Sequence, residues 1–304
     1  MKELVEFRID ERKAAKYLRP TDGVHLGTSV RKILLPATDE LVTKILMIHK
    51  KLKESGDWLF VFSHVHRRYT ENEMRAANAF KVIIKHYFEP AGEECGTVYD
   101  ESSACKYCGA SGLQVSDLIL ETRSLPKPDK IGIAKTIAGE IVVSQNFVDL
   151  FKANKVKGAE FRAVRQRRDP GQPVPGWYQL LVTSKSLNIV APTLVGVSPF
   201  DDGSEPPPNG EEIFDRLGLV GSWCDRISQH RCPLGDTIGL NLISELWLQR
   251  EEVGEWDVAW TKQKIGVRRG ELRPESLLVF SSRLRDLVLH QKLKGMGFEP
   301  VHFI

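Results

Sequence analysis

The sequence predicts an α+β protein in which an N-terminal α/β layer is followed by two related strand–helix–strand units, the first carrying a cysteine-rich metal knuckle. Segments with strand periodicity alternate with capped helical patterns, which indicates mixed structure. One strand–helix–strand pattern occurs twice along the chain. Three of the five cysteines lie between positions 95 and 108, which gathers the metal-binding side chains in the first unit.

The composition is that of an ordinary soluble protein, with 41% hydrophobic and 27% charged residues among 304. A net charge of +3 is too small to indicate a nucleic-acid partner by itself. No uncharged apolar run approaches the roughly 20 residues that a membrane-spanning helix needs. The N-terminus lacks the apolar core of a signal peptide, and an odd cysteine count argues against a secreted disulfide scaffold. We therefore expect a cytoplasmic protein with reduced thiols.

We expect the chain to divide where its composition changes. Residues 1–90 would form the N-terminal α/β region, and residues 91–200 the first unit with its cysteine knuckle. Residues 201–210 are rich in Pro and Gly and predict a solvent-exposed linker. Residues 211–304 would form the second, degenerate unit.

The N-terminal region predicts a strand, a helix and a second strand. Residues 3–9 alternate imperfectly between apolar and polar side chains, which favours a strand. Apolar residues then repeat at helical spacing after Thr38 or Asp39, either of which could be the N-cap, and Gly56 ends this helix. Residues 58–66 are rich in aromatic and β-branched side chains and predict a largely buried strand.

Another helix is predicted after this strand. Thr70 and Glu73 have the spacing of a capping box, in which each side chain bonds the backbone amide of the other residue. Four apolar residues then form a stripe at helical spacing: Met74, Ala77, Phe80 and Ile84. We therefore expect the helix to continue through this stripe.

His64 and His66 lie two residues apart on the predicted strand, so their side chains would share one face and could chelate a metal ion. The other interpretation is a polar strand face beside Arg67 and Arg68, since histidine is often half-buried or at the surface. The sequence leaves both interpretations open.

Cys95, Cys105 and Cys108 are the candidate metal ligands. Cys105 and Cys108 form a Cys-x-x-Cys-Gly knuckle, in which a tight turn directs two thiolates at one ion. Thiolates are soft donors, so we expect a structural, tetrahedral Zn²⁺ that needs one more protein ligand. The candidates for that ligand are His86, Asp100, Cys224 and Cys232.

Two other interpretations of these cysteines stay open. They could be three unligated thiols, or Cys105 and Cys108 could be a redox pair. A redox pair is expected after a strand and before a helix, where the thiol pKa is lowered, and the sequence does not predict that context.

The segment after the cysteines predicts strands around a loop. Residues 116–121 resemble a short strand, and residues 130–143 contain enough Ile and Val for one or two more. Residues 125–129 include two prolines, which are incompatible with a helix interior or a central strand.

A helix between two strands completes the first unit. Ser144 is suitable as its N-cap, and Gly158 lies in the turn that follows it. Residues 159–164 then predict a strand. The apolar stripe of the helix consists of Phe147, Leu150 and Phe151.

The same pattern returns at the C-terminus with an offset of 137 residues. Residues 142–164 and 279–301 are identical at nine of 23 positions, which fall at the helix cap, the apolar stripe, the helix end and the buried strand. Matches confined to those roles are what one unit used twice would leave. Convergence on a common helix–strand pattern is the alternative.

A different offset applies upstream. Residues 116–118 match residues 244–246 in character, and Asp129 matches Asp257. The second unit would then contain nine extra residues, which we place in the loop at residues 266–274.

The second unit carries a degenerate form of the cysteine knuckle. Cys224 and Cys232 lie where the first unit has Cys95 and Cys105. Gly235 takes the place of Cys108, so the second unit lacks one of the ligands.

The sequence gives no positive sign of catalysis. It contains no nucleophile elbow, phosphate-binding loop, dinucleotide fingerprint or His-Glu-x-x-His motif. A deaminase centre would need a His-x-Glu ahead of a Pro-Cys-x-x-Cys pair, but Ala104 precedes Cys105 here. We therefore expect a protein that is not an enzyme.

The basic residues also argue against nucleic-acid binding. The clusters at residues 67–68, 165–168 and 268–269 are short and far apart, and 40 acidic residues offset them. Trp177 and Tyr178 could form a stacking platform near the second cluster, but we interpret that segment as a surface loop.

Three motifs together carry a family resemblance. Residues 94–109, 139–144 and 157–164 resemble the bacterial double-CxxCG immunity proteins and the related immunity families found beside polymorphic toxins. Residues 281–301 resemble the closing motif of those families, a serine-started helix that leads to a final Pro-Val strand.

The resemblance covers residues 90–164 and 220–304. It implies a non-enzymatic antitoxin that binds and neutralises a cognate protein toxin. Residues 232–235 replace the second Cys-x-x-Cys-Gly, so the resemblance does not extend to a second metal site. The alternative is a zinc-ribbon protein that binds nucleic acid or acts as a regulator.

Overall fold

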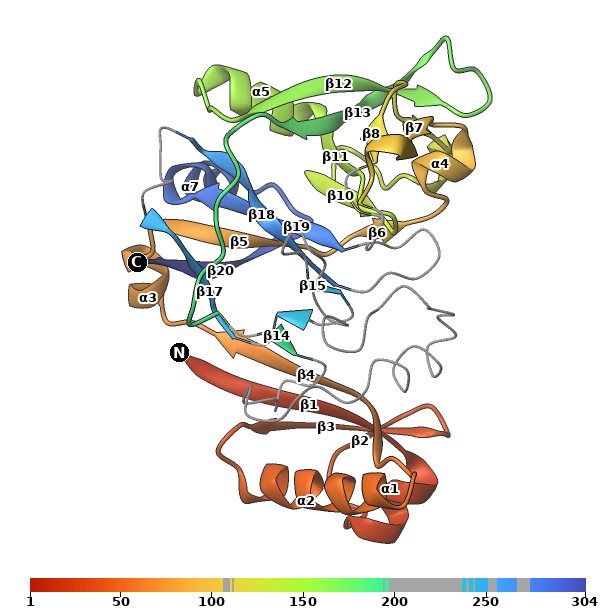
Figure 1. The fold of residues 1–304 in the computed structure, drawn as a ribbon, viewed down its shortest axis with the longest axis vertical. Coiled ribbons are helices and arrows are strands. Elements are labelled where there is room, and N and C mark those ends of the chain that lie inside the picture. The colour runs from red at the N-terminus through yellow and green to blue at the C-terminus, as the bar shows by residue number, and fades with distance from the viewer. Residues whose placement is uncertain are drawn as a thin grey trace. The chain divides into compact units, whose positions relative to one another are not determined.

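The computed structural model describes residues 1–105, 110, 112–193, 195–196, 237–238, 241–242, 244–250, 256–266 and 274–304. They form an α+β protein with several sheets and few helices (Figure 1). The chain divides into two compact units, with the boundary between Ala76 and Ala77. In the part of the chain described here, no helix is long and apolar enough to cross a membrane.

The N-terminal unit is a four-stranded antiparallel sheet with strand order β2-β3-β1-β4. This element order and strand order are those of the split βαβ, or ferredoxin-like, topology. In chain order, the elements are β1 (Lys2–Asp10), α1 (Glu11–Tyr17), β2 (Val24–Leu26), β3 (Val30–Pro36), α2 (Glu40–Glu54), β4 (Phe60–Arg68) and α3 (Glu71–Ala76).

Both longer helices of this unit cover the same face of the sheet (Figure 1). Val5, Phe7 and Ile9 alternate along β1 and are buried against Ala14 of α1 and Ile45 of α2. This alternation is the period-2 pattern that predicted the strand. The opposite face of the sheet is covered by neither α1 nor α2.

The predicted starts of α2 and α3 are confirmed. The Asp39 carboxylate accepts a hydrogen bond from the Leu41 amide at 2.8 Å. The Thr70 amide donates to Glu73 at 2.7 Å, and the Glu73 amide donates to the Thr70 hydroxyl at 3.3 Å. These bonds satisfy amides that have no partner inside the helix.

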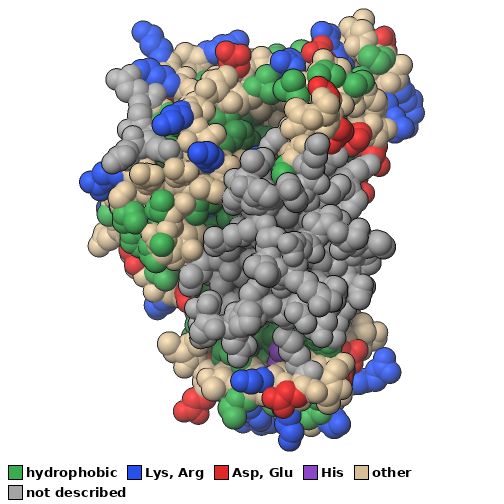
Figure 2. All heavy atoms as spheres, viewed as in Figure 1, with side chains coloured by type: hydrophobic (Ala, Val, Ile, Leu, Met, Phe, Trp, Pro, Cys, Tyr) green, Lys and Arg blue, Asp and Glu red, His purple; other side chains and the backbone are tan. Residues whose placement is uncertain are grey.

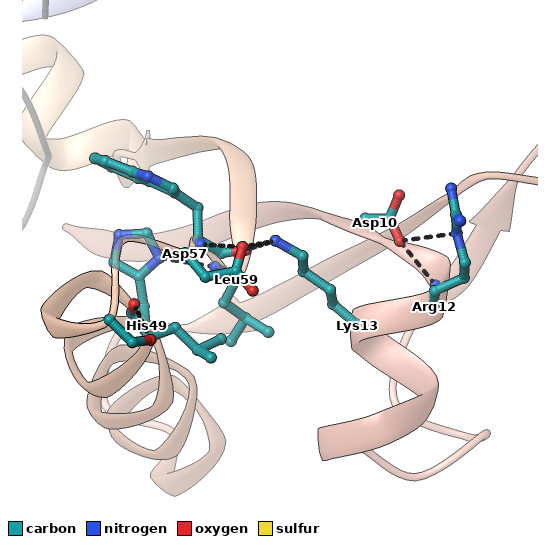
Figure 3. Close-up of polar contacts among 9 residues, drawn as sticks. Asp10, Arg12, Lys13, His49, Asp57 and Leu59 are labelled. Carbon is teal, nitrogen blue, oxygen red and sulfur yellow. Dashed lines mark hydrogen bonds and ion pairs between the residues drawn. The ribbon is translucent and has the colours of Figure 1, made fainter. Parts of the chain in front are cut away.

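The turn before β4 is tied to both helices (Figure 3). The Lys13 ammonium on α1 contacts the Asp57 carboxylate and donates to the Trp58 carbonyl at 2.5 Å. The Leu59 amide donates to His49 Nδ1 on α2 at 3.3 Å. These contacts fix the position at which β4 enters the sheet.

The helix predicted through Ile84 is wrong. Helix α3 ends at Ala76, and β5 (Ala79–Ile84) follows it as an interior strand of the C-terminal unit. Phe80 and Ile84 are spaced for one face of a helix and for one face of a strand, so periodicity could not separate the two. Pairing with a strand on each side decides the conformation. It also explains why the N-terminal unit ends at Ala76, although the sequence placed the boundary at residue 90.

The C-terminal unit contains two six-stranded sheets. In the order of the sheet, the first has β6 (Tyr87–Phe88), β10 (Ile133–Thr136), β11 (Ile141–Ser144), β13 (Pro173–Val182), β12 (Ala159–Gln166) and β9 (Ile119–Leu120). The second has β15 (Thr237–Ile238), β18 (Val258–Gly266), β19 (Glu275–Ser281), β5, β20 (Met296–Phe303) and β17 (Leu246–Leu248).

Short elements complete this unit. Helix α5 (Gln145–Ala153) follows β11, and helix α7 (Ser282–His290) follows β19. The cysteine segment begins with α4 (Gly92–Cys95) and continues through β7 (Tyr99–Asp100), a 3₁₀ turn at Glu101–Ser103 and β8 (Leu113–Gln114). The remaining elements are a 3₁₀ turn at Thr122–Ser124, β14 (Val195–Gly196) and β16 (Asn241–Leu242).

The two six-stranded sheets have the same series of pairings. From the β6 and β15 edges, each runs parallel, antiparallel, antiparallel, antiparallel, parallel. The registers also agree: Val143 lies opposite Tyr178 in the first sheet, and Phe280 lies opposite Phe80 in the second. If the halves are taken as β5 to β12 and β13 to β20, the first strand of each half lies inside the sheet of the other.

The two sheets share one hydrophobic core. Ile133, Val143 and Phe147 of the first half are buried in the same cluster as Val258 and Phe280 of the second. The rings of Phe147 and Phe280 lie 6.1 Å apart, in a tilted arrangement. The sheets are therefore held together by apolar burial as well as by the exchanged strands.

The halves meet through reciprocal backbone contacts. The Asp257 amide donates to the Lys157 carbonyl at 3.0 Å, and the Gly132 amide donates to the Lys294 carbonyl at 2.8 Å. Gly132 and Asp257 therefore make the same kind of backbone contact with the other half, which is a different match from the pairing of Asp129 with Asp257 made from sequence.

The starts of α5 and α7 also differ between the two halves. Asp257 is buried and accepts from the Ser281 hydroxyl at 2.7 Å, and Ser281 in turn caps Leu284 of α7 at 3.1 Å. Ser144 holds the predicted N-cap position of α5, but its buried hydroxyl has no hydrogen bond within the described structure. Gly132 has no side chain that could accept a hydrogen bond from the Ser144 hydroxyl, as Asp257 does from Ser281.

We predict that Gly158 and Gly295 do not tolerate alanine. Gly158 has a φ of +101° and Gly295 a φ of +104°. A Cβ at Gly158 would clash with the Val258 carbonyl oxygen, and a Cβ at Gly295 would lie 2.5 Å from the Ile133 carbonyl oxygen. Each substitution should destabilise the C-terminal unit by about 1–3 kcal/mol in urea unfolding followed by tryptophan fluorescence.

The control is Gly171→Ala in the turn between β12 and β13. A Cβ there would meet a carboxylate oxygen of Asp169 at 3.2 Å, which can move aside. We expect a change within about 0.5 kcal/mol. Equal effects at Gly158 and Gly171 would contradict the close backbone approach.

Candidate functional site

The cysteine segment is positioned by Glu140, in the turn between β10 and β11. One carboxylate oxygen of Glu140 accepts from the Gly92 amide at 3.1 Å and from the Tyr99 hydroxyl at 2.8 Å. The other contacts the Thr136 hydroxyl. Glu140 thus holds the start of α4 and strand β7, between which Cys95 lies.

Two of the three predicted ligands lie in the described structure, and both are buried. Cys95 ends α4, and the Cys105 amide donates to the Ala110 carbonyl at 2.8 Å. Cys108 lies outside the described residues, as do Cys224 and Cys232. Among the described residues no three His, Cys, Asp or Glu side chains are grouped so that they could hold a metal. The zinc site therefore stays a prediction.

The other two candidates for the fourth ligand, Asp100 and His86, lie within the described residues. The Asp100 carboxylate accepts from the Ser102 amide at 2.9 Å, and hydrogen bonds from the Ser102 side chain and backbone lower the pKa of Asp100. The His86 ring lies close to Gly295. Burial raises the pKa of the Cys95 thiol, although the Glu121 backbone and the Arg167 charge oppose this. A raised thiol pKa does not favour redox chemistry at Cys95.

The second candidate site is the face of the N-terminal sheet opposite α1 and α2, which we call the open face. Directly opposed residues in antiparallel strands share a face. Glu6 lies opposite His64 on β4, and Arg8 lies opposite Phe62 on β4 and Lys32 on β3. Side chains from three strands therefore gather on this face.

Glu6 is the centre of this group and is 4% exposed. Its carboxylate accepts hydrogen bonds from Arg8 Nε at 2.9 Å and His66 Nε2 at 3.0 Å, and Lys32 Nζ lies 2.9 Å away. Burial raises the pKa of Glu6, but the hydrogen bonds from Lys32, Arg8 and His66 together outweigh it and lower the pKa to about 2. Glu6 is therefore ionised throughout the physiological range.

Three rings lie in a row along β4. The rings of Phe62 and His64 are stacked 6.2 Å apart, and those of His64 and His66 meet edge to face at 4.7 Å. The Arg8 guanidinium lies over the Phe62 ring, 4.6 Å from its centroid. The two histidines share one face, as the sequence predicted. His66 bonds Glu6, so the histidines belong to a carboxylate-centred cluster.

Apolar side chains occupy the part of the open face that lies on β2 and β3. Val24 lies opposite Lys32, and Leu34 lies opposite Glu6, so both face the same way as the cluster. Val24 is 61% exposed, Leu26 42% and Leu34 43%, and Phe62, on the β4 side of the face, is 40% exposed. Large apolar side chains grouped at this exposure are typical of interaction surfaces.

Sequence reasoning singled out His64 and His66 here and missed Glu6, Arg8 and Lys32. The alternation along β1 does put Glu6 and Arg8 on the side away from the core, which was a usable signal. Their partners lie on β3 and β4, and the sequence does not reveal that pairing.

On the described part of the face seen in Figure 2, charged side chains do not gather into one patch. Figure 2 shows Lys and Arg side chains spread over the visible face with Asp and Glu between them. No protein-family model matches the chain, and comparison with the curated proteins finds no match. The function of the chain is therefore inferred from its residues and their geometry.

We predict that Glu6→Gln makes the stability of the N-terminal unit less dependent on pH. An ionised Glu6 stabilises the fold fully above its usual pKa of 4.5, and this contribution is lost as the pH falls toward 2. The variant should be less stable than the parent by roughly 1–3 kcal/mol at pH 7, with the difference shrinking toward pH 2. Urea titrations read from amide signals of β1 measure this.

The matched control is Glu54→Gln, an exposed carboxylate at the end of α2. It should leave both stability and pH dependence nearly unchanged. A Glu6→Gln deficit that stays constant between pH 7 and pH 2 would mean that shape, not charge, accounts for it.

Proposed function

We propose that the chain is a non-enzymatic immunity protein of bacterial type that binds and neutralises a cognate protein toxin in the cytoplasm. The observation that carries this proposal is the open face, where Val24, Leu34 and Phe62 are exposed on a sheet whose other face is packed against helices. A rigid, partly apolar face is suited to binding a protein surface. The resemblance of the cysteine segment to immunity families supports the same function.

We propose further that the cysteine segment is a zinc-stapled structural element. Support comes from the Cys-x-x-Cys-Gly spacing and from the burial of Cys95 and Cys105. When bound, Zn²⁺ would cross-link the segment by holding the thiolates of Cys95, Cys105 and Cys108. Glu140 would orient the segment that carries them.

We also infer that the two halves of the C-terminal unit are copies of one strand–helix–strand unit. The nine identities between residues 142–164 and 279–301 support this, as do the matching pairing series of the two sheets. In this interpretation Gly132 and Asp257 are the same position, at which one copy has lost its side chain or the other has gained one.

The immunity function predicts protection from a toxin. Co-expression of the chain with the product of a toxic neighbouring gene should restore growth, and the two proteins should copurify. Failure to rescue any toxic neighbour, together with the absence of a copurifying partner, would contradict the proposal. Salt-sensitive retention on nucleic acid would favour the alternative, a zinc-ribbon nucleic-acid-binding or regulatory protein.

The zinc site predicts about one zinc ion per chain in protein purified without added metal. A Cys105→Ala/Cys108→Ala variant should lose both the zinc and part of its thermal stability. The control is His64→Ala/His66→Ala, which should keep the zinc because that pair belongs to the Glu6 cluster. Freshly reduced protein without bound metal would contradict the site.

A further inference from the structure

The open face carries more positive than negative charge. Strand pairing places four cationic side chains on it: Lys2, Arg8, Lys32 and Arg68. Two carboxylates share the face, Glu6 in its middle and Asp10 at the end of β1. The balance of charge on this face is therefore positive.

Glu6 is not available to a partner, and Asp10, whose side chain is 36% exposed, is engaged at the start of α1. Glu6 is buried beneath Arg8, Lys32 and His66. Asp10 accepts from the Arg12 amide at 3.0 Å at the start of α1. Most of the exposed charge of the face is thus cationic, with Asp10 at one end of it, and Arg68 is an exposed cation that forms no ion pair within the described residues.

The cations border an apolar strip. Leu34 is 43% exposed, next to the Lys32 side of the Glu6 cluster, and Val24 and Leu26 continue the strip along the β2 edge. A surface that fits this face needs carboxylates opposite Arg68 and Arg8 and apolar side chains opposite Leu34. Complementary charge and apolar contact together give both orientation and affinity.

We propose that the open face docks an acidic surface of a partner protein, one that presents carboxylates beside apolar side chains. This inference rests on the proposed partner-binding function and adds the chemistry of the partner. It also assigns the binding role to the N-terminal unit rather than to the cysteine segment.

A single-stranded nucleic acid is the competing occupant, and the rings argue against it. Such binding depends on aromatic faces on which bases can stack. The Phe62 ring has the Arg8 guanidinium over it and the His64 ring stacked beside it. The polar backbone of a nucleic acid would also leave the apolar strip of Val24, Leu26 and Leu34 without apolar contacts.

The test measures the binding of three fluorescein-labelled probes to the full chain by anisotropy. The probes are a decapeptide of alternating Glu and Leu, its Lys–Leu counterpart, and oligo(dT). The Glu–Leu peptide should bind, and Leu34→Asp and Arg68→Glu should each weaken it at least about tenfold. Controls on the exposed side of α2, Met47→Asp and Lys51→Glu, should leave binding unchanged.

Three outcomes would overturn the inference. Equal binding of the Glu–Leu and Lys–Leu peptides would remove the charge preference. Tighter, salt-sensitive binding of oligo(dT) that Arg68→Glu abolishes would assign the face to nucleic acid. The chain itself contains six acidic residues and no Lys or Arg between positions 201 and 215. Tighter peptide binding after their conversion to amides would assign the face to this acidic segment of the chain itself and not to a partner protein.

Different results would contradict the docking surface and the immunity function. If the chain rescues cells from a toxin and Leu34→Asp and Arg68→Glu rescue equally well, the docking surface lies elsewhere and the immunity function stands. If the Glu–Leu peptide binds as expected and no toxic neighbour is neutralised, the acidic partner stands without the immunity function.

Discussion

The C-terminal unit depends on an exchange of strands between its two sheets. Strand β5 precedes the segment that builds the first sheet, yet it lies between β19 and β20 in the second. Strand β13 follows that segment and lies between β11 and β12 in the first. Without β5 the second sheet would have an unfilled interior position, and the strands beside it would have backbone groups without partners. The second sheet therefore depends on a strand that precedes the first sheet in the chain.

Close contacts follow from this arrangement. The turns at Gly158 and Gly295 each lie close to the backbone of the other half, so neither position has room for a side chain. The shared core allows both halves to bury their helices at one interface. The two halves differ at Asp257 and Gly132, and within the described residues the buried Ser144 hydroxyl has no partner like the one that Ser281 has in Asp257.

The two candidate sites differ in what supports them. The cysteine segment has the sequence pattern of a metal knuckle, and Glu140 anchors it to the hairpin of β10 and β11. The open face has no motif, but its side chains form a closed network in which one buried carboxylate organises two cations and a histidine. A cluster organised in this way presents a fixed pattern of positive charge beside an apolar strip, so its geometry supports binding more directly than the cysteine spacing does.

The sequence by itself determined the local elements: the alternation in β1, the start of α2 at Thr38 or Asp39, the Thr70 cap, and the helix starts at Ser144 and Ser281. These depend on neighbours a few residues away, so periodicity and capping chemistry are sufficient to find them. Tertiary structure decided that residues 79–84 form a strand, because pairing on both sides outweighed a pattern that fitted either conformation. It also brought Glu6, Lys32 and His66 together, since contacts between separate strands depend on register, which no local pattern encodes.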